Sequence, residues 1–231
     1  MYEQGVAEDL HGTILGAPVS LGIHESQSRS WENIIGRSLP FWKHYYPRLK
    51  ELFPAQLNNV SLGEFYAGIN HVEPSCIRIE ADEVTYNLHI ILRFELEMAI
   101  LSGDLDVQDL PGAWNERMKS LLGITPPSDA EGVLQDVHWS AGLFGYFPTY
   151  ALGNLYGAQF AAKIAEVVPD LDSRIENGDF APILKWQREN IHAFGTIYSA
   201  GDLCKKATGS TLDPAFFMNY LNGKFREIYD L

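Results

Sequence analysis

The densest group of residues that could do chemistry lies between Gly132 and Tyr150, where the sequence reads GVLQDVHWSAGLFGYFPTY. Glycines let a backbone approach a ligand, and His138, Tyr146 and Tyr150 could donate hydrogen bonds to a substrate or to a developing oxyanion. Tyr146 and Tyr150 are four residues apart, so both can lie on one face of a helix. The alternative is that these aromatic side chains pack a core, which is the commoner use of such a stripe.

A second group is HESQSR at residues 24–29, at the start of a segment with helical periodicity. It brings together a histidine, a carboxylate, an amide and a guanidinium. The carboxylate of Glu25 alone is not a metal site, because a hydrolytic zinc needs three protein ligands and an open position for water. Taken by itself, the segment favours the structural alternative of a solvated, capped helix start.

A third group is IRIEAD at residues 77–82, followed by a helical segment that contains Tyr86, His89 and Arg93. The guanidinium fork of Arg78 could hold the terminal carboxylate of a peptide through two parallel hydrogen bonds. Equally, Arg78 could pair with an acidic neighbour while Asp82 caps the following helix. The residues alone leave both interpretations open.

Helices are expected to position these groups. Residues 23–53 carry apolar side chains near helical spacing, with Pro40 as a kink or break, which indicates one long helix or two joined ones. Ser61 and Glu64 form a capping box at the start of a short helix. Residues 76–80 are a brief β-prone stretch.

Two further helices are predicted over residues 83–102, ended by Gly103, and 110–122, closed by Gly123. A turn-rich loop follows them, and small residues predict another helix over residues 152–168. The helical stripe expected on the helix at 83–102 consists of Val84, Leu88, Ile91, Leu92, Glu95 and Met98.

The sequence contains no internal repeat, low-complexity tract or recognisable linker. The expected fold is therefore mainly α, a single helical unit with at most a small β element. We expect residues 1–231 to form one domain around one continuous core.

Charge and cysteine content exclude several classes of function. The chain has 17 Lys and Arg against 30 Asp and Glu, a net charge of −13, which disfavours binding to nucleic acid and to anionic membranes. Its two cysteines, Cys76 and Cys204, suggest neither a disulfide framework nor a zinc ribbon. There is no apolar run of about 18 residues and no signal-peptide pattern at the start. We expect a soluble, cytoplasmic protein.

Taken together, the three groups resemble the signature motifs of the carboxypeptidase Taq family of thermostable zinc carboxypeptidases. The family motif HES-Q corresponds to residues 24–27, IRxxAD to 77–82 and GxxQDxHW to 132–139. The resemblance continues through NIHAFG at 190–195 into the C-terminal FMNYLNGKFREIY, so it covers essentially the whole chain. It implies a fold like the C-terminal part of a zincin-type helical metallopeptidase.

The resemblance also implies roles for single residues. Glu25 would be the third zinc ligand. Arg78 would bind the terminal carboxylate of the substrate, and His24 and Gln27 would also belong to the substrate-binding site. Oxyanion and substrate contacts at the reacting centre would come from His138, Tyr146 and Tyr150.

The family's HExxH and DxRxT motifs do not occur in this sequence. Residues 1–5, MYEQG, resemble the stretch that follows HExxH in the family, so we expect a C-terminal portion truncated just after that motif. The family activity would be hydrolytic release of C-terminal amino acids from peptides by zinc-activated water, with cobalt as another metal. The chain by itself is expected to be inactive and not to retain zinc stoichiometrically.

The alternative function is a non-catalytic peptide-binding or assembly module derived from the same family. Saturable, metal-independent peptide binding that weakens in an Arg78→Ala variant would distinguish it. The expected partners are peptide C-termini and a second copy of the chain, as a homodimer or another self-association, because a truncated helical enzyme exposes apolar surface. Neither nucleic acid nor a membrane is expected as a partner.

Overall fold

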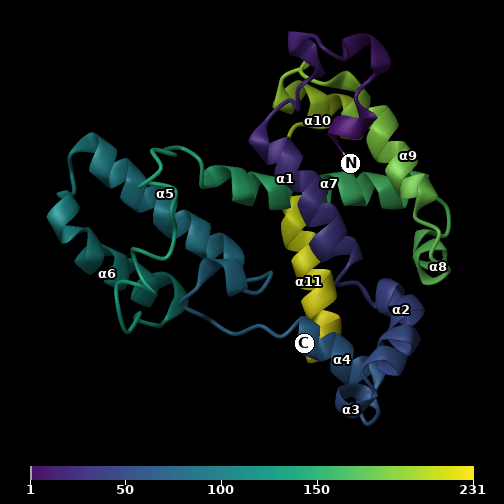
Figure 1. Cartoon of the computed structure of the whole chain (residues 1–231), viewed down its shortest axis with the longest axis horizontal. Coiled ribbons are helices and arrows are strands. Elements are labelled where there is room, and N and C mark those ends of the chain that lie inside the picture. Colours follow the sequence, from purple (N-terminus) through teal and green to yellow (C-terminus); the bar gives the residue numbers. More distant parts are fainter. Residues whose placement is uncertain (1) are drawn as a thin grey trace. The chain divides into compact units, whose positions relative to one another are not determined.

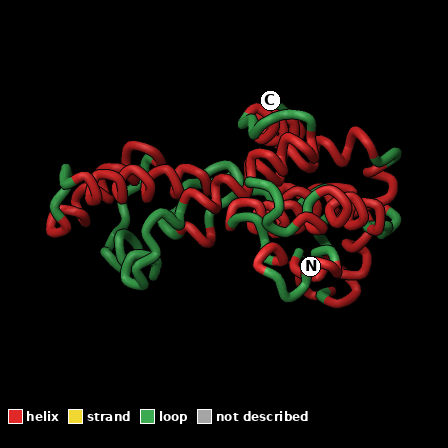
Figure 2. Tube along the Cα trace, turned by 90° about the horizontal axis from the view of Figure 1, so that it is seen from above, coloured by secondary structure: helices red, strands yellow, loops and turns green. Residues whose placement is uncertain are grey.

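The computed structural model describes residues 2–231, and all the regular elements in that range are helices, without a strand (Figures 1 and 2). This confirms the expected mainly α fold. The α-helices are α1 (Leu21–Arg29), α2 (Leu39–Leu52), α3 (Pro54–Leu57), α4 (Leu62–Ile69), α5 (Tyr86–Ser102), α6 (Leu110–Leu122), α7 (Pro148–Val167), α8 (Leu171–Glu176), α9 (Ala181–Asn190), α10 (Ala200–Thr208) and α11 (Ala215–Tyr229).

The chain divides into two compact units. Unit 1 comprises the residues up to Ile69 together with Leu152–Leu231, and unit 2 comprises Asn70–Ala151. Unit 1 is therefore built from two separate stretches of sequence, whereas unit 2 is one continuous stretch. The expectation that residues 1–231 form a single domain stays a prediction.

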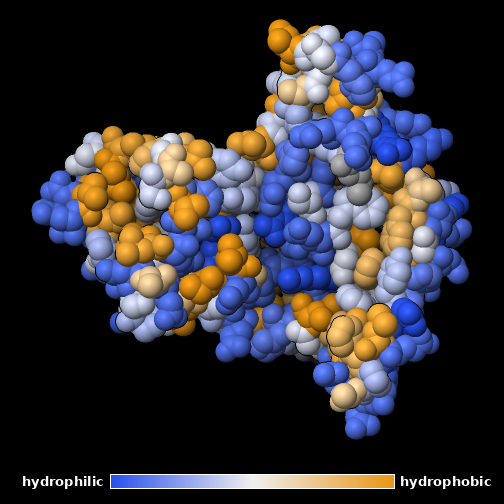
Figure 3. Space-filling model, viewed as in Figure 1, coloured by the Kyte–Doolittle hydropathy of each residue, from blue (hydrophilic) through white to orange (hydrophobic). Residues whose placement is uncertain are grey.

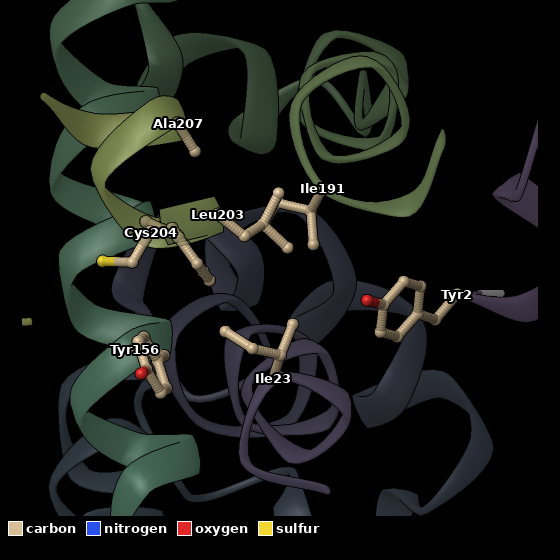
Figure 4. Close-up of a cluster of buried hydrophobic side chains, with 8 residues drawn as sticks. Tyr2, Ile23, Tyr156, Ile191, Leu203, Cys204 and Ala207 are labelled. Carbon is tan, nitrogen blue, oxygen red and sulfur yellow. The ribbon is translucent and has the colours of Figure 1, made fainter. Parts of the chain in front are cut away.

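Apolar side chains from both stretches of sequence build the core of unit 1. Figure 4 shows one cluster, in which Tyr2 and Ile23 lie close to side chains of α7 and α10. Its buried members are Tyr2, Ile23, Tyr156, Phe160, Ile191, Leu203, Cys204 and Ala207. Burial of such side chains is the main force that holds the two stretches together.

The segment at residues 23–53 forms two helices joined by a π-helix, η4 (Ser30–Ile35). Pro40 does not kink a helix. It lies in the first turn of α2, where its missing N–H has no helical partner to lose. The Ser61 and Glu64 capping box is confirmed, because the backbone N–H of each residue donates to the side chain of the other.

Unit 2 confirms the two predicted helix ends. Gly103 and Gly123 follow α5 and α6 in the left-handed conformation. The β-prone prediction for residues 76–80 is wrong, since Arg78–Glu80 is a single turn of 3-10 helix. Its conformation is fixed by tertiary contacts, because the backbone N–H of Arg78 donates to Gln135 and its side chain is buried.

The helical stripe expected on α5 is only partly buried. Leu92 is buried, whereas Ile91 is 41% exposed and Met98 is 52% exposed. The buried face combines apolar side chains with polar ones, among them His89 and Arg93. Ion pairing can compensate the burial of such groups, and the helix therefore turns part of its apolar surface outward. Hydrophobic residues are visible on the surface of this unit in Figure 3.

Candidate functional site

Glu25 lies in the middle of α1, which begins at Leu21 because the side chain of Ser20 accepts a hydrogen bond from the backbone N–H of Ile23. One turn later, Nε of Arg29 donates to Oε1 of Glu25 at 2.8 Å. Oε2 of Glu25 accepts no hydrogen bond within residues 2–231. The carboxylate is thus held through one oxygen.

The other two polar residues of this motif differ in their surroundings. His24 is half-exposed, and its Nε2 lies 4.0 Å from the carboxylate of Glu3. Gln27 is buried, its Oε1 lies 2.8 Å from Nε2 of His192, and its Nε2 donates to Ser26. Gln27 therefore stabilises the interior of unit 1. Its expected contact with substrate, and that of His24, stay predictions.

Three side chains expected to be catalytic come together in unit 2. Nε2 of His138 lies 2.9 Å from the hydroxyl oxygen of Tyr150. The ring of Tyr146 is centred 5.4 Å from that of His138 and 5.5 Å from that of Tyr150. The structure shows a compact histidine–tyrosine cluster, although Tyr146 precedes α7 and the two tyrosines therefore do not share one helix face. The catalytic role of its members stays a prediction.

Burial lowers the pKa of His138, and the positive charges of Arg78 and Arg93 act in the same direction against the opposing effect of Asp136. The imidazole is therefore neutral at neutral pH. Its Nδ1 lies 3.7 Å from Asp136, too far for a hydrogen bond. This geometry favours the tautomer in which Nε2 carries the proton and donates to Tyr150.

Arg78 occupies a buried ion-pair network. Its Nη2 lies 2.6 Å from Oδ1 of Asp136, while Nε of Arg93 lies 2.7 Å from Oδ2 of the same carboxylate. The side chains of Arg78, Arg93 and Asp136 are 7%, 0% and 10% exposed. Nη1 of Arg78 donates to the hydroxyl of Tyr86 at 3.0 Å.

These contacts match the structural interpretation of the IRxxAD segment. Arg78 pairs with an internal carboxylate, and Oδ1 of Asp82 accepts from the backbone N–H groups of Val84 and Thr85. The fork of Arg78 is thus engaged inside unit 2. Its expected contact with a substrate carboxylate stays a prediction that nothing in this geometry favours.

Gln135 and Asp136 stand within the GxxQDxHW motif, and the sequence alone assigns no role to either. Gln135 joins the two motif segments, since its Oε1 accepts from the backbone N–H of Arg78 and its Nε2 donates to the carbonyl of Cys76. One feature of the sequence indicates that Arg93 has a buried carboxylate partner, without identifying it as Asp136. Arg93 stands in the apolar run LHIILRFELEM, and an arginine buried in such a helix requires a carboxylate partner.

The described residues do not complete a metal site. Residues 2–231 contain no group of three or more His, Cys, Asp or Glu side chains arranged to hold a metal ion. Glu25 has the right chemistry for one zinc ligand, but a single carboxylate cannot hold the ion. By themselves, these residues therefore do not fit zinc or cobalt.

Acid is expected to destabilise each unit through one buried histidine. Burial lowers the pKa of His89 in unit 2 and of His192 in unit 1 to about 4, from 6.5, with nearby arginines adding to the effect. Between these values the unfolded chain binds more protons than the folded chain, so stability is complete above pH 6.5 and falls as the pH falls toward 4. At about pH 5 the expected loss is about 2 kcal/mol per histidine.

Urea denaturation at several pH values would measure this loss. A His89→Leu variant should show a weaker dependence on pH than the wild-type chain. His71→Gln, which replaces an exposed histidine of the same unit, should keep the wild-type dependence. Equal slopes for all three proteins would contradict the assignment to His89.

The chain is similar to known carboxypeptidases. A family profile described as carboxypeptidase Taq (M32) metallopeptidase matches residues 1–225. Thermostable carboxypeptidase 1 of Thermus thermophilus is 50% identical over 99% of this chain, and carboxypeptidase 1 of Bacillus subtilis is 48% identical over 99%. The crystal structure of an M32 carboxypeptidase from Deinococcus radiodurans matches the whole chain at 45% identity with a TM-score of 0.97.

The chain spans less than half the length of these proteins. It covers 45% of the Thermus protein, and 46% of both the Bacillus protein and the Deinococcus structure. Within residues 2–231 no helix has the length and hydropathy needed to span a bilayer.

Proposed function

Because the chain belongs to the carboxypeptidase Taq (M32) metallopeptidase family, we propose that it supplies part of the active site of a zinc metallocarboxypeptidase. The reaction would be hydrolytic release of C-terminal amino acids from peptides. The observation that carries the proposal is the family match over residues 1–225, which contains all three motifs. The geometry of Glu25, whose carboxylate is held through one oxygen by Arg29, supports it.

In this proposal Glu25 is the ligand that unit 1 contributes to the metal. The remaining ligands come from an HExxH segment, which is not present in residues 1–231. Bound zinc would supply activated water for hydrolysis. Without that segment the chain neither holds zinc stoichiometrically nor cleaves peptides.

The histidine–tyrosine cluster of unit 2 is proposed to stabilise the oxyanion that forms at the scissile carbonyl. Nε2 of His138 donates to the hydroxyl oxygen of Tyr150, which orients this hydroxyl within the cluster. A neutral imidazole makes this possible, and burial keeps the pKa of His138 low. Tyr146 packs against both rings and is the second candidate donor.

The proposal extends to location and assembly. Both cysteines are free thiols, which is consistent with a reducing cytoplasm. Exposed apolar residues of α5, such as Ile91 and Met98, are consistent with self-association. The alternative of a non-catalytic module gains no support from these relatives, both of which are named as carboxypeptidases.

A chimera would test the role of Glu25. We would replace the matching segment of the Thermus protein by this chain and measure chelator-sensitive release of C-terminal residues from a peptide. Glu25→Gln is expected to lower this activity at least about 100-fold. Mutating a residue that only hydrogen-bonds to a metal ligand can already lower activity by that factor, and losing the ligand itself should lower it no less. The 231-residue chain alone should release nothing.

Glu32→Gln is the matched control, because it removes the same negative charge from the same neighbourhood. Oε2 of Glu32 lies 3.9 Å from Nη1 of Arg29, but the Glu32 side chain is mostly exposed. This variant should keep nearly full activity. A fully active Glu25→Gln chimera would reject Glu25 as a ligand, and chelator-resistant activity would reject the metallopeptidase mechanism.

A further inference from the structure

Helices α1 and α7 are in close contact at Glu25. The two helices cross in unit 1 (Figure 1), and Gly153 of α7 lies against Glu25 of α1. A Cβ atom placed on Gly153 would lie 2.5 Å from Cγ and 2.8 Å from Cβ of Glu25, and 3.2 Å from its backbone carbonyl carbon. Real atoms cannot approach so closely, so a side chain at position 153 would force the helices or Glu25 to move.

Rotation of the Glu25 side chain cannot relieve this clash. A change in χ1 moves Cγ, but Cβ and the carbonyl carbon are fixed to the backbone of α1. One turn further along α7 the approach is looser, because a Cβ on Gly157 would lie 3.3 Å from the carbonyl oxygen of Ser26. Of these two glycines of α7, the one with less space beside it is thus the one that contacts the residue expected to bind metal.

The Glu25 side chain is confined from a second direction by Arg29. Nε of Arg29 donates to Oε1 at 2.8 Å, and both side chains are mostly buried, with Arg29 17% exposed and Glu25 22% exposed. The contact with the Gly153 backbone fixes the position of Cβ and Cγ of Glu25, and the hydrogen bond from Arg29 fixes the position of its carboxylate. A carboxylate ligand needs both kinds of constraint, because groups behind a ligand fix its orientation.

We propose that Gly153 and Arg29 are positioning residues that together hold the Glu25 carboxylate in one orientation. Their importance for catalysis rests on the proposed function. The confinement itself is a property of unit 1 and requires neither metal nor substrate to be measured.

Gly153→Ala in the 231-residue chain tests the proposal. The first measurement is the ¹H–¹⁵N resonance of the Arg29 Nε–H group, which reports its hydrogen bond to Glu25. In Gly153→Ala this resonance should shift most of the way to its position in Glu25→Ala, where no carboxylate is present. The second is the equilibrium constant for unfolding, which should rise roughly 10- to 100-fold, as for other overpacked sites.

Gly223→Ala is the matched control. Gly223 lies inside α11, and a Cβ there would meet nothing within 4 Å. Alanine forms helix better than glycine, so this variant should lower the equilibrium constant for unfolding several-fold. It should leave the Arg29 resonance unchanged.

If Gly153→Ala does not fold, the proposal can still be tested with the double variant Glu25→Gly, Gly153→Ala. It removes Cβ and Cγ of Glu25, so it should fold and unfold less readily than Gly153→Ala alone. A folded Gly153→Ala chain with an unchanged Arg29 resonance, or a double variant no more stable than the single one, would overturn the proposal. Loss of Glu25 dependence in the chimera assay would instead reject the proposed function and leave these results standing.

Discussion

Replacing Asp136 by alanine is expected to lower the free energy of unfolding of unit 2 by about 3–5 kcal/mol. The carboxylate lies 2.6 Å from Arg78 and 2.7 Å from Arg93, and all three side chains are almost fully buried. Its removal leaves two guanidinium groups in the interior without a counter-charge. Urea denaturation followed by the fluorescence of Trp114, which packs against Arg93, would measure the loss.

Asp129→Ala provides the control for net charge, because Asp129 is exposed on the same turn-rich loop. Its effect should stay within about 0.5 kcal/mol. Burial raises the pKa of Asp136, but the hydrogen bond from Arg78 and the charges of both arginines outweigh burial, so the net pKa is lowered. The carboxylate therefore stabilises the fold above its ordinary pKa of 3.8, and the difference between wild type and variant should narrow as the pH falls below that value. Equal losses for both variants would contradict the role of Asp136.

Gly195→Ala is expected to destabilise unit 1 by roughly 2–6 kcal/mol, the sum of backbone strain and overpacking. Gly195 has φ 47° and ψ −128°, a conformation that residues with a side chain rarely adopt. A Cβ there would also overlap the carbonyl oxygen of Leu15. That oxygen accepts a hydrogen bond from Thr196, so it cannot move away without breaking the contact. Thermal and urea denaturation would measure the effect.

Gly209→Ala separates the two causes. Gly209 also has a positive φ, 92°, but a Cβ there would meet nothing within 4 Å. Only the strain should remain, about 1–2 kcal/mol. If Gly195→Ala lowered the free energy of unfolding no more than Gly209→Ala does, overlap with the carbonyl oxygen of Leu15 would make no contribution.

Local signals in the sequence sufficed for most helices and their ends. Gly103, Gly123 and the Ser61–Glu64 capping box act through neighbouring backbone groups, so a few residues of sequence contain the whole interaction. The exposed face of α5 could not be found in this way. It depends on the pairing of Arg93 with Asp136, which lies 43 residues further along the chain.

The same distinction holds for the candidate site. His138, Tyr146 and Tyr150 lie within one short segment that the sequence marks as a candidate site, and their side chains lie close together in the structure. The internal pairing of Arg78 and the contact of Gly153 with Glu25 join residues far apart in sequence. Neither contact leaves a local pattern, and the Glu25 environment therefore required the structure.

The division of the chain has a consequence for how the protein is made. Unit 2 is continuous, so its contacts can form as soon as Ala151 has left the ribosome, whereas the first stretch of unit 1 must wait for Leu152–Leu231. Synthesis of residues 70–151 takes roughly 4–16 s at the usual rate. During that time Ile23 and Tyr2 lack the side chains of α7 and α10 that later cover them. The surroundings of Glu25 are thus completed late, and a chaperone that shields α1 during this interval would favour a correctly built site.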